Sequence, residues 1–245
     1  MKRFTLIFAA LAAIISGCRD DSGIRGYWSS RTPDIENITA AEDEFADFAL
    51  LAAQAPEKDA FAAVDMLLKK ARTDEVTYLV YTDWIIRGFS SLASPCFSCP
   101  IFIHASKRIL SQGIVGQYEA DEIKRFREFC LHNHVGDKLE LPPLVDGICS
   151  DTFCGKRTLF LVVDPFCPAC RESMQPFLKP EWEGTRRVAL CYGHGPLPEI
   201  EGWECHKICD DQTILDTRQA PFCFVAASDG TIELSYTRVN DEILF

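Results

Sequence analysis

Apolar residues recur every three or four positions through much of the first half of the chain, from Thr39 to His134. This is the period of helices that bury one face. Helix starts are expected near Thr39, Pro56, Thr73, Pro100 and Glu119. The expected inward residues are Phe45, Phe48, Ala52, Phe61, Val64, Leu68, Ala71, Val76, Val80, Trp84, Ile123, Phe126 and Cys130. Thr39 and Glu42 have the spacing of a capping box. The pattern predicts an all-α domain over residues 39–136, without a recognisable catalytic motif.

The pattern changes after Gly136. Thr158–Val163 is a continuous apolar run, typical of a strand buried on both faces of an α/β sheet, and Arg187–Tyr192 is expected to be a second buried strand. Ala220–Ser235 reads as two strands joined by a Ser-Asp-Gly turn, which predicts a hairpin. Residues 137–245 are therefore expected to form an α/β domain, and the fold class is an α/β domain preceded by an all-α domain.

The N-terminus predicts export. Lys2 and Arg3 precede a short apolar run, and small residues then lead to Cys18. This is the pattern of a secretory signal peptide over residues 1–17. The sequence Ile15-Ser16-Gly17-Cys18 resembles a bacterial lipobox, which implies cleavage before Cys18 and attachment of lipid to Cys18. The alternative is an ordinary signal peptide that releases a secreted chain. Residues 18–38 are polar and are expected to be a tether, partly docked through Tyr27 and Trp28.

Charge and cysteine content narrow the possible partners. The chain has 25 basic and 36 acidic residues, and removal of Lys2 and Arg3 leaves a net charge of −13. Such acidity argues against nucleic acid as a partner. Of 12 cysteines, 11 follow Cys18, so at least one thiol lacks an intramolecular partner. Export permits disulfides, but their pairing cannot be read from the sequence.

A Cys-x-x-Cys motif, Cys167-Pro168-Ala169-Cys170, directly follows the first buried strand. A redox couple, a structural disulfide and half of a zinc site all use this spacing. A zinc site would need a second pair, such as Cys96 and Cys99 from the other domain. The expected position of Cys167 at a helix start favours a thiolate, the reactive form of cysteine. Pro168 suits the first helical position, and the small Ala169 would allow a substrate to approach.

The order of strand, motif, helix, strand and X-Pro hairpin carries a family resemblance. FLVVDPFCPACRESMQPFL followed by QAPFCFVAASDGTIEL resembles the thioredoxin-like fold, and most closely membrane-tethered, periplasm-facing thiol–disulfide oxidoreductases of the TlpA type. The match covers about Leu141 to Phe245. More loosely, the chain resembles bacterial lipoproteins that join a helical N-terminal domain of unknown function to such a domain.

The resemblance implies roles for individual residues. Cys167 would be the nucleophile and Cys170 the resolving thiol. Pro221 would be a cis proline facing the couple, and the Ala220 backbone would pair with substrate. Three features depart from the family pattern: Leu161 occupies the position of the usual buried acid, Pro176 lies one residue later than the usual helix-kink proline, and little chain remains for a final helix. Asp164 is the nearest acid to the motif, either functional or simply a turn residue.

The remaining cysteines and histidines leave alternatives open. Cys96 and Cys99 could form a local disulfide, a second redox centre or, with His104, a metal site. Cys149 and Cys154 could staple a hairpin. Cys205 and Cys209 are expected on a strand, where they could not bond to each other. Cys130, Cys191 and Cys223 are expected to be small buried hydrophobic residues. His132 and His134 are expected to contact carbonyl groups at a helix end.

Two functions from different classes follow. The first is a lipid-anchored thiol–disulfide oxidoreductase of the cell envelope, facing the periplasm and acting on protein cysteines. The absence of histidine at Ala169 favours reduction or isomerisation over oxidation. No cofactor or metal is expected, and no nucleotide-binding motif is present, so a reductase would need a membrane redox partner. The second is a non-catalytic binding or scaffold lipoprotein that retains the fold and a disulfide.

Overall fold

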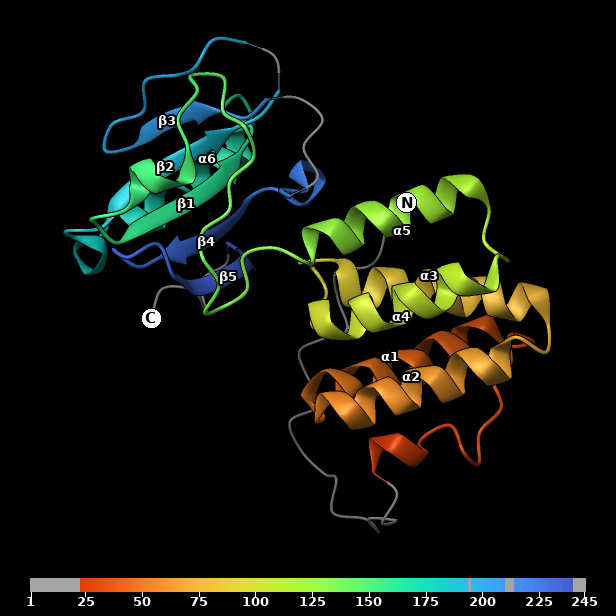
Figure 1. Ribbon diagram of the computed structural model, residues 1–245. Coiled ribbons are helices and arrows are strands. Elements are labelled where there is room, and N and C mark those ends of the chain that lie inside the picture. The colour runs from red at the N-terminus through yellow and green to blue at the C-terminus, as the bar shows by residue number, and fades with distance from the viewer. Residues whose placement is uncertain (1–22, 194, 210–213, 240–245) are drawn as a thin grey trace.

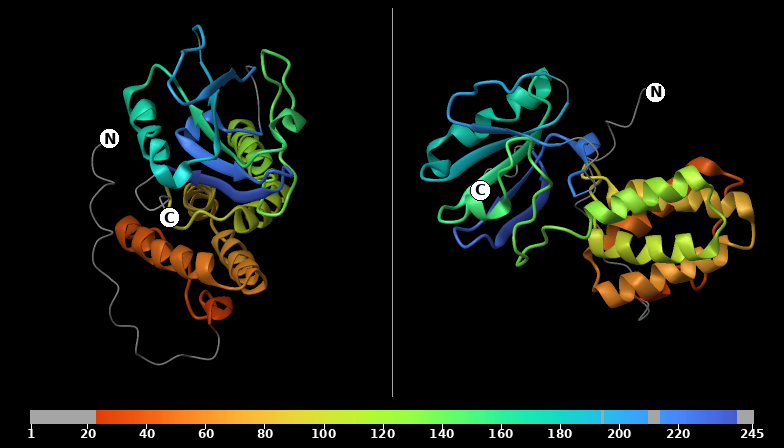
Figure 2. Two further views of the ribbon diagram at one scale, coloured as in Figure 1. Left: turned by 90° about the vertical axis from the view of Figure 1, so that its left-hand side faces the viewer. Right: turned by 45° about the horizontal axis from the view of Figure 1, so that its top comes forward.

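The computed structural model describes residues 23–193, 195–209 and 214–239, and the signal peptide and Cys18 lie outside these ranges. The described chain has a helical domain followed by an α/β domain, seen as two lobes in Figures 1 and 2. The helical domain consists of α1 (Ile38–Gln54), α2 (Glu57–Ala71), α3 (Glu75–Ser90), α4 (Cys99–Gln112) and α5 (Gln117–Phe129). None of the helices within the described ranges is long and apolar enough to cross a membrane.

The helix positions agree with the apolar pattern, but two details of the prediction are wrong. Asn37, rather than Thr39, caps α1, and its side chain accepts a hydrogen bond from the Ala40 amide at 3.3 Å. Val76 is 60% exposed. The buried face of α3 instead runs through Tyr78 and Tyr81, because these bulky rings fill the centre of the bundle.

The segment before α1 is docked on the helical domain. Trp28 is fully buried and makes edge-to-face contacts with Phe48 and Tyr81, at centroid distances of 5.5 and 5.9 Å. The Lys70 ammonium donates hydrogen bonds to the backbone carbonyls of Ser29 and Arg31. Burial of an indole is worth a few kcal/mol, so residues 28–31 belong to the folded domain rather than to a solvated tether.

The α/β domain contains a five-stranded sheet in the order β3-β2-β1-β4-β5. Its strands are β1 (Thr158–Val163), β2 (Arg186–Cys191), β3 (Glu204–Lys207), β4 (Phe222–Ala226) and β5 (Ile232–Arg238). β1, β2 and β3 are parallel, whereas β4 and β5 run antiparallel to their neighbours. The short helix α6 (Pro168–Glu172) and the 3-10 turns η3 (Gln175–Leu178) and η4 (Pro180–Trp182) follow β1.

The two faces of the sheet belong to different cores. One face packs beneath α6 and the turns after it, in a core that includes Leu161, Met174 and Phe177. The other face, which includes Phe160 and Phe224, continues into the core of the helical domain. Helical residues thus complete the second face of the sheet.

Aromatic rings join the two lobes. Phe129, the last residue of α5, is fully buried and stacks on Tyr236 of β5 with ring centroids 4.4 Å apart. It also makes an edge-to-face contact with Phe222 of β4 at 5.7 Å. The Asn133 side chain, 1% exposed, donates to the Tyr236 hydroxyl at 2.6 Å and to the Glu140 carbonyl at 2.8 Å. The connection between the lobes is therefore buried and hydrogen-bonded.

Candidate functional site

The Cys-x-x-Cys motif lies where β1 ends and α6 begins, as expected from the sequence. Asp164 follows β1, and its carboxylate accepts a hydrogen bond from the Phe166 amide at 2.9 Å. The Asp164 carbonyl accepts from the Cys167 amide at 3.1 Å. These bonds form a compact turn between the end of β1 and the motif. Asp164 thus has the role of a turn residue, and a functional role for its carboxylate stays a prediction.

The two thiols of the motif differ in exposure. Cys167 is partly exposed, whereas Cys170 is 3% exposed and belongs to the core beneath α6. The Cys167 carbonyl accepts a hydrogen bond from the Arg171 amide at 3.2 Å, which closes the first helical turn. Within this turn the Cys167 sulfur lies at the surface and the Cys170 sulfur lies behind it. An incoming disulfide can therefore reach Cys167 but not Cys170.

The surroundings keep Cys170 protonated. Burial raises the pKa of its thiol to about 11, a backbone hydrogen bond from Asp164 opposes the rise, and a hydrogen bond and negative charge at Cys167 add to it. The same cluster acts on Tyr192, whose pKa is raised to about 12 by burial first and then by negative charge at Cys170, Asp164 and Cys167. Tyr192 was not singled out from the sequence. Its place beside the motif follows from the pairing of β1 with β2, since its amide donates to the Val163 carbonyl.

The Ala220–Pro221 peptide bond is cis. β4 pairs with β1 so that Phe222 faces Val162. This pair is the end of the ladder, so Pro221 directly precedes the end of β4 that adjoins the end of β1, from which the motif turn leaves the sheet. The structure thus brings Ala220 and Pro221 next to the turn that carries Cys167, although their predicted contact with substrate stays a prediction.

The helical domain holds the segment just before Pro221. The Gln219 side chain accepts from the Leu92 amide at 2.7 Å and donates to the Ser90 carbonyl at 3.0 Å, which links it to the end of α3. Arg218 pairs with Glu122 of α5 at 2.5 Å and with the buried Asp216 at 2.8 Å. No local signal in the sequence pointed to the contacts with the helical domain, which join residues 127 and 129 positions apart for Gln219 and 96 positions apart for Arg218.

An exposed aromatic residue also lies in the motif loop. The Phe166 ring is 51% exposed. It packs over Gly195, where a Cβ would lie 2.8 Å from the ring, and Gly195 also has a φ of +135° that side chains disfavour. A glycine is therefore required for this ring to occupy its position.

The other described cysteines form contacts that the sequence did not reveal. In this structure Cys96, Cys149, Cys154 and Cys209 are thiols, so neither the Cys96–Cys99 nor the Cys149–Cys154 disulfide is present. Cys99 instead lies against Cys130, and a hydrogen bond to Cys99 together with burial raises the pKa of Cys130.

Three of these cysteines belong to the sheet. β3 carries Cys205 but ends before Cys209, and these two are not bonded to each other, as expected. Cys205 contacts Cys191 of β2. Cys191 and Cys223 are buried, as expected, but Cys191 has a thiol neighbour rather than a purely apolar one.

The histidines contact carboxylates. His132 lies 2.6 Å from Glu140 and 3.1 Å from Glu128, so the expected contact with carbonyl groups is wrong for this residue. His104 lies 2.9 Å from Asp65 and stacks on Phe61 rather than on a cysteine. Within the described ranges, no group of three histidine, cysteine or acidic side chains is arranged to hold a metal ion.

Comparison with known proteins places the fold. A crystal structure of a thioredoxin-like protein from Bacteroides caccae superposes with a TM-score of 0.71 at 15% identity, covering 96% of this chain and 95% of the other. The fold of this chain is thioredoxin-like. Because the match spans both lobes, the helical domain is part of the shared architecture. This confirms the fold class expected from the sequence.

Other comparisons are partial or negative. A conserved protein of unknown function from Bacteroides fragilis matches 45% of this chain and 96% of its own at 18% identity, with a TM-score of 0.37. The thioredoxin domain of a thiol–disulfide oxidoreductase from Bacteroides vulgatus matches 46% of this chain and 91% of its own at 13% identity, with a TM-score of 0.31. Both TM-scores are too low for either match to add to the assignment of the fold. No protein-family model and no curated protein matches the sequence.

Proposed function

We propose that the protein is a thiol–disulfide oxidoreductase of the cell envelope, anchored through lipid on Cys18, that uses Cys167 and Cys170 to exchange disulfides with protein cysteines. The observation that carries the proposal is the asymmetry of the motif. Cys167 is accessible at the surface, and Cys170 is buried directly behind it within hydrogen-bonding distance. A thioredoxin-like fold supplies the setting.

The reaction in the reducing direction has two steps. The Cys167 thiolate attacks a substrate disulfide, forming a mixed disulfide and releasing one substrate thiolate, which takes up a proton. Cys170 then loses its proton to water and attacks the Cys167 sulfur, which releases the second substrate thiolate. The products are the Cys167–Cys170 disulfide and two substrate thiols, so two electrons pass from protein to substrate.

The environment of Cys170 fits the order of these steps. Its raised pKa keeps it protonated while Cys167 is the thiolate, so the two sulfurs do not compete for substrate. Once Cys167 is in a mixed disulfide, its negative charge is gone and this part of the rise in the Cys170 pKa disappears. Formation of the intermediate thus makes Cys170 easier to ionise.

Substrates and partners are inferred from sequence features. Ala169 occupies the place where a histidine would favour strong oxidants, so reduction or isomerisation is the favoured direction. A reductase must be reduced again, and the sequence has no nucleotide-binding motif. A membrane thiol carrier is therefore the class of partner that would resupply electrons. The lipobox and signal peptide support a periplasm-facing location on the inner or outer membrane.

Turnover with a defined substrate tests the proposal. The purified full chain, first reduced and then separated from reductant, is mixed with an excess of a peptide that contains one disulfide, and released peptide thiol is counted. The wild type and Cys149→Ser, an exposed control, should each release two thiols per chain from the Cys167–Cys170 couple. Cys170→Ser should release one, and Cys167→Ser none from this site.

The same experiment separates the enzyme from a scaffold. Every chain in this assay, the one called wild type included, has Cys191 and Cys205 replaced by Ala. Thiol release is then measured without a contribution from these two cysteines. If the wild-type motif releases no peptide thiol, or if Cys167→Ser releases as much as the wild type, the oxidoreductase proposal fails and the non-catalytic lipoprotein becomes the better interpretation.

A further inference from the structure

A second pair of thiols, Cys191 and Cys205, lies in the α/β domain, in the same core as the Cys-x-x-Cys motif. β2 and β3 are parallel, and Cys205 of β3 pairs with Ala189 of β2. Because side chains alternate along a strand, Cys191 lies on the same face as Ala189, one diagonal step from Cys205. Cys205 packs against the core cluster that contains Cys191, so the two side chains are close neighbours.

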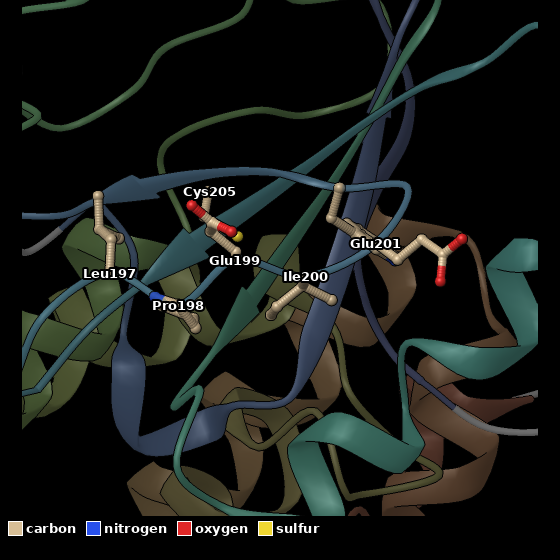
Figure 3. Close-up of a pocket in the computed structure, with 7 residues that line it drawn as sticks. Leu197, Pro198, Glu199, Ile200, Glu201 and Cys205 are labelled. Carbon is tan, nitrogen blue, oxygen red and sulfur yellow. The ribbon is translucent and has the colours of Figure 1, made fainter.

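The two thiols of this pair differ in access. Cys191 is 2% exposed and lies in the core beneath α6, whereas Cys205 is partly exposed. Cys205 also lines a surface pocket with residues of the loop before β3, including Leu197, Glu199 and Glu201 (Figure 3). One sulfur can therefore meet a solute, while the other can be reached only through it. The motif Cys167–Cys170 shows the same division between an accessible and a buried sulfur.

We propose that Cys205 and Cys191 form a second redox-active cysteine pair, with Cys205 as the nucleophile at the pocket and Cys191 as the buried thiol that closes a disulfide between β3 and β2. β3 has four residues and is an edge strand. Closing the disulfide requires the two sulfurs to approach to about 2.05 Å, so the proposal includes a small shift of this short strand toward β2.

The electrostatics of the pair agree with this division of roles. The hydrogen bond from Cys191 lowers the pKa of Cys205 to about 7, with burial opposing and the Ile200 amide and His206 assisting. The hydrogen bond to Cys205 and burial raise the pKa of Cys191, so its proton stays on until Cys205 has reacted. At neutral pH a substantial fraction of Cys205 is then the reactive thiolate.

The pocket indicates a class of co-reactant. Glu199 and Glu201 give its lining negative charge at neutral pH, so a small disulfide that carries amines is favoured over an anionic one. The Cys205 thiolate attacks such a disulfide, one aminothiolate leaves and takes up a proton, and Cys191 then gives up its proton and displaces the second aminothiolate from the Cys205 sulfur. Two protein thiols are oxidised and one small disulfide is reduced to two thiols.

The test uses the full chain with Cys167→Ser and Cys170→Ser, so the outcome does not depend on the proposed function of that couple. The protein is treated with cystamine, a cationic disulfide, and mapped by peptide mass spectrometry. We expect a Cys191–Cys205 disulfide, with two cysteamines released for each such disulfide formed. With Cys191→Ala we expect a lasting cysteamine adduct on Cys205, and with Cys205→Ala no modification of Cys191.

Two further measurements keep the proposal falsifiable. The pH profile of Cys205 alkylation by iodoacetamide should have its midpoint near 7, and Cys191→Ala should move it toward the unperturbed value of about 8.5. Cystamine should react at least several-fold faster than the anionic dithiodiglycolate. A lasting adduct on Cys205 in the chain that retains Cys191 would overturn the proposal. So would a Cys191–Cys205 disulfide that is already present after purification and resists glutathione, since that bond would be structural.

Discussion

Replacement of Gln219 by Ala tests whether the helical domain holds the segment that carries Pro221. The Gln219 side chain makes two hydrogen bonds to backbone groups of the helical domain, at 2.7 Å from the Leu92 amide and 3.0 Å to the Ser90 carbonyl. Each such bond contributes about 1 kcal/mol net to stability, and a backbone group left unsatisfied costs about 1–3 kcal/mol. The loss should therefore be about 2–3 kcal/mol.

The assay is urea unfolding of the full chain, followed by tryptophan fluorescence at neutral pH. Gln112→Ala is a matched control, because Gln112 is partly exposed and, among the described residues, its side chain donates one hydrogen bond, to the neighbouring Ser111 hydroxyl. It should cost less than about 0.5 kcal/mol. Gln219→Glu should fall between the two, because it keeps an acceptor for the Leu92 amide but loses the donor to Ser90.

A functional readout accompanies the stability measurement. If the two hydrogen bonds of Gln219 position Ala220 and Pro221 beside the motif, Gln219→Ala should slow peptide-disulfide reduction by the folded protein. The rate is measured at urea concentrations well below the unfolding transition. A Gln219→Ala variant as stable and as active as Gln112→Ala would refute the argument that the helical domain supports the site.

Three other outcomes are expected. Phe129→Ala should lower the free energy of unfolding by about 3–5 kcal/mol, because a fully buried ring is lost where the lobes meet, whereas Tyr118→Ala, at a ring 76% exposed, should cost less than about 0.5 kcal/mol in the same urea titration. Burial lowers the pKa of His132, but hydrogen bonds to Glu140 and Glu128 outweigh it, so the pKa is raised. The stability that His132 contributes is therefore present below pH 6.5 and lost as the pH rises through the folded pKa. A His132→Gln chain whose stability relative to the wild type does not change over this pH range would contradict this. Palmitate-analogue labelling of expressing cells should mark the wild type and not Cys18→Ala, and equal labelling would exclude lipid on Cys18.

The sequence predicted the parts of the fold that depend on local patterns. The run Thr158–Val163 is buried at every position, and apolar from Leu159 onward, because β1 is the central strand and is covered on both faces. Because Cys167 comes four residues after this strand in the sequence, its place at the end of β1 followed from the strand prediction. The expected helix start at Pro100 lies in the first turn of α4, and Gly113 ends that helix in the left-handed conformation that glycine adopts readily.

The parts that escaped prediction depend on contacts between distant residues. Val76 and Tyr78 fit helical patterns on different faces of α3, and only the packing of the bundle decides which face is buried. The contact between Cys191 and Cys205 requires the register of β2 against β3, which no local signal gives. The bonds of Gln219 depend likewise on how the two lobes meet.

Capture of the mixed disulfide tests the central claim most directly. The full chain with Cys191→Ala and Cys205→Ala, in which Cys170→Ser or Cys167→Ser is added, is mixed with a disulfide-containing peptide, quenched with acid and mapped by mass spectrometry. The account predicts a stable peptide adduct on Cys167 in the Cys170→Ser chain and no adduct on Cys170 in the Cys167→Ser chain. Adducts at equal levels on both thiols, or on neither, would contradict the assignment of Cys167 as nucleophile and Cys170 as resolving thiol.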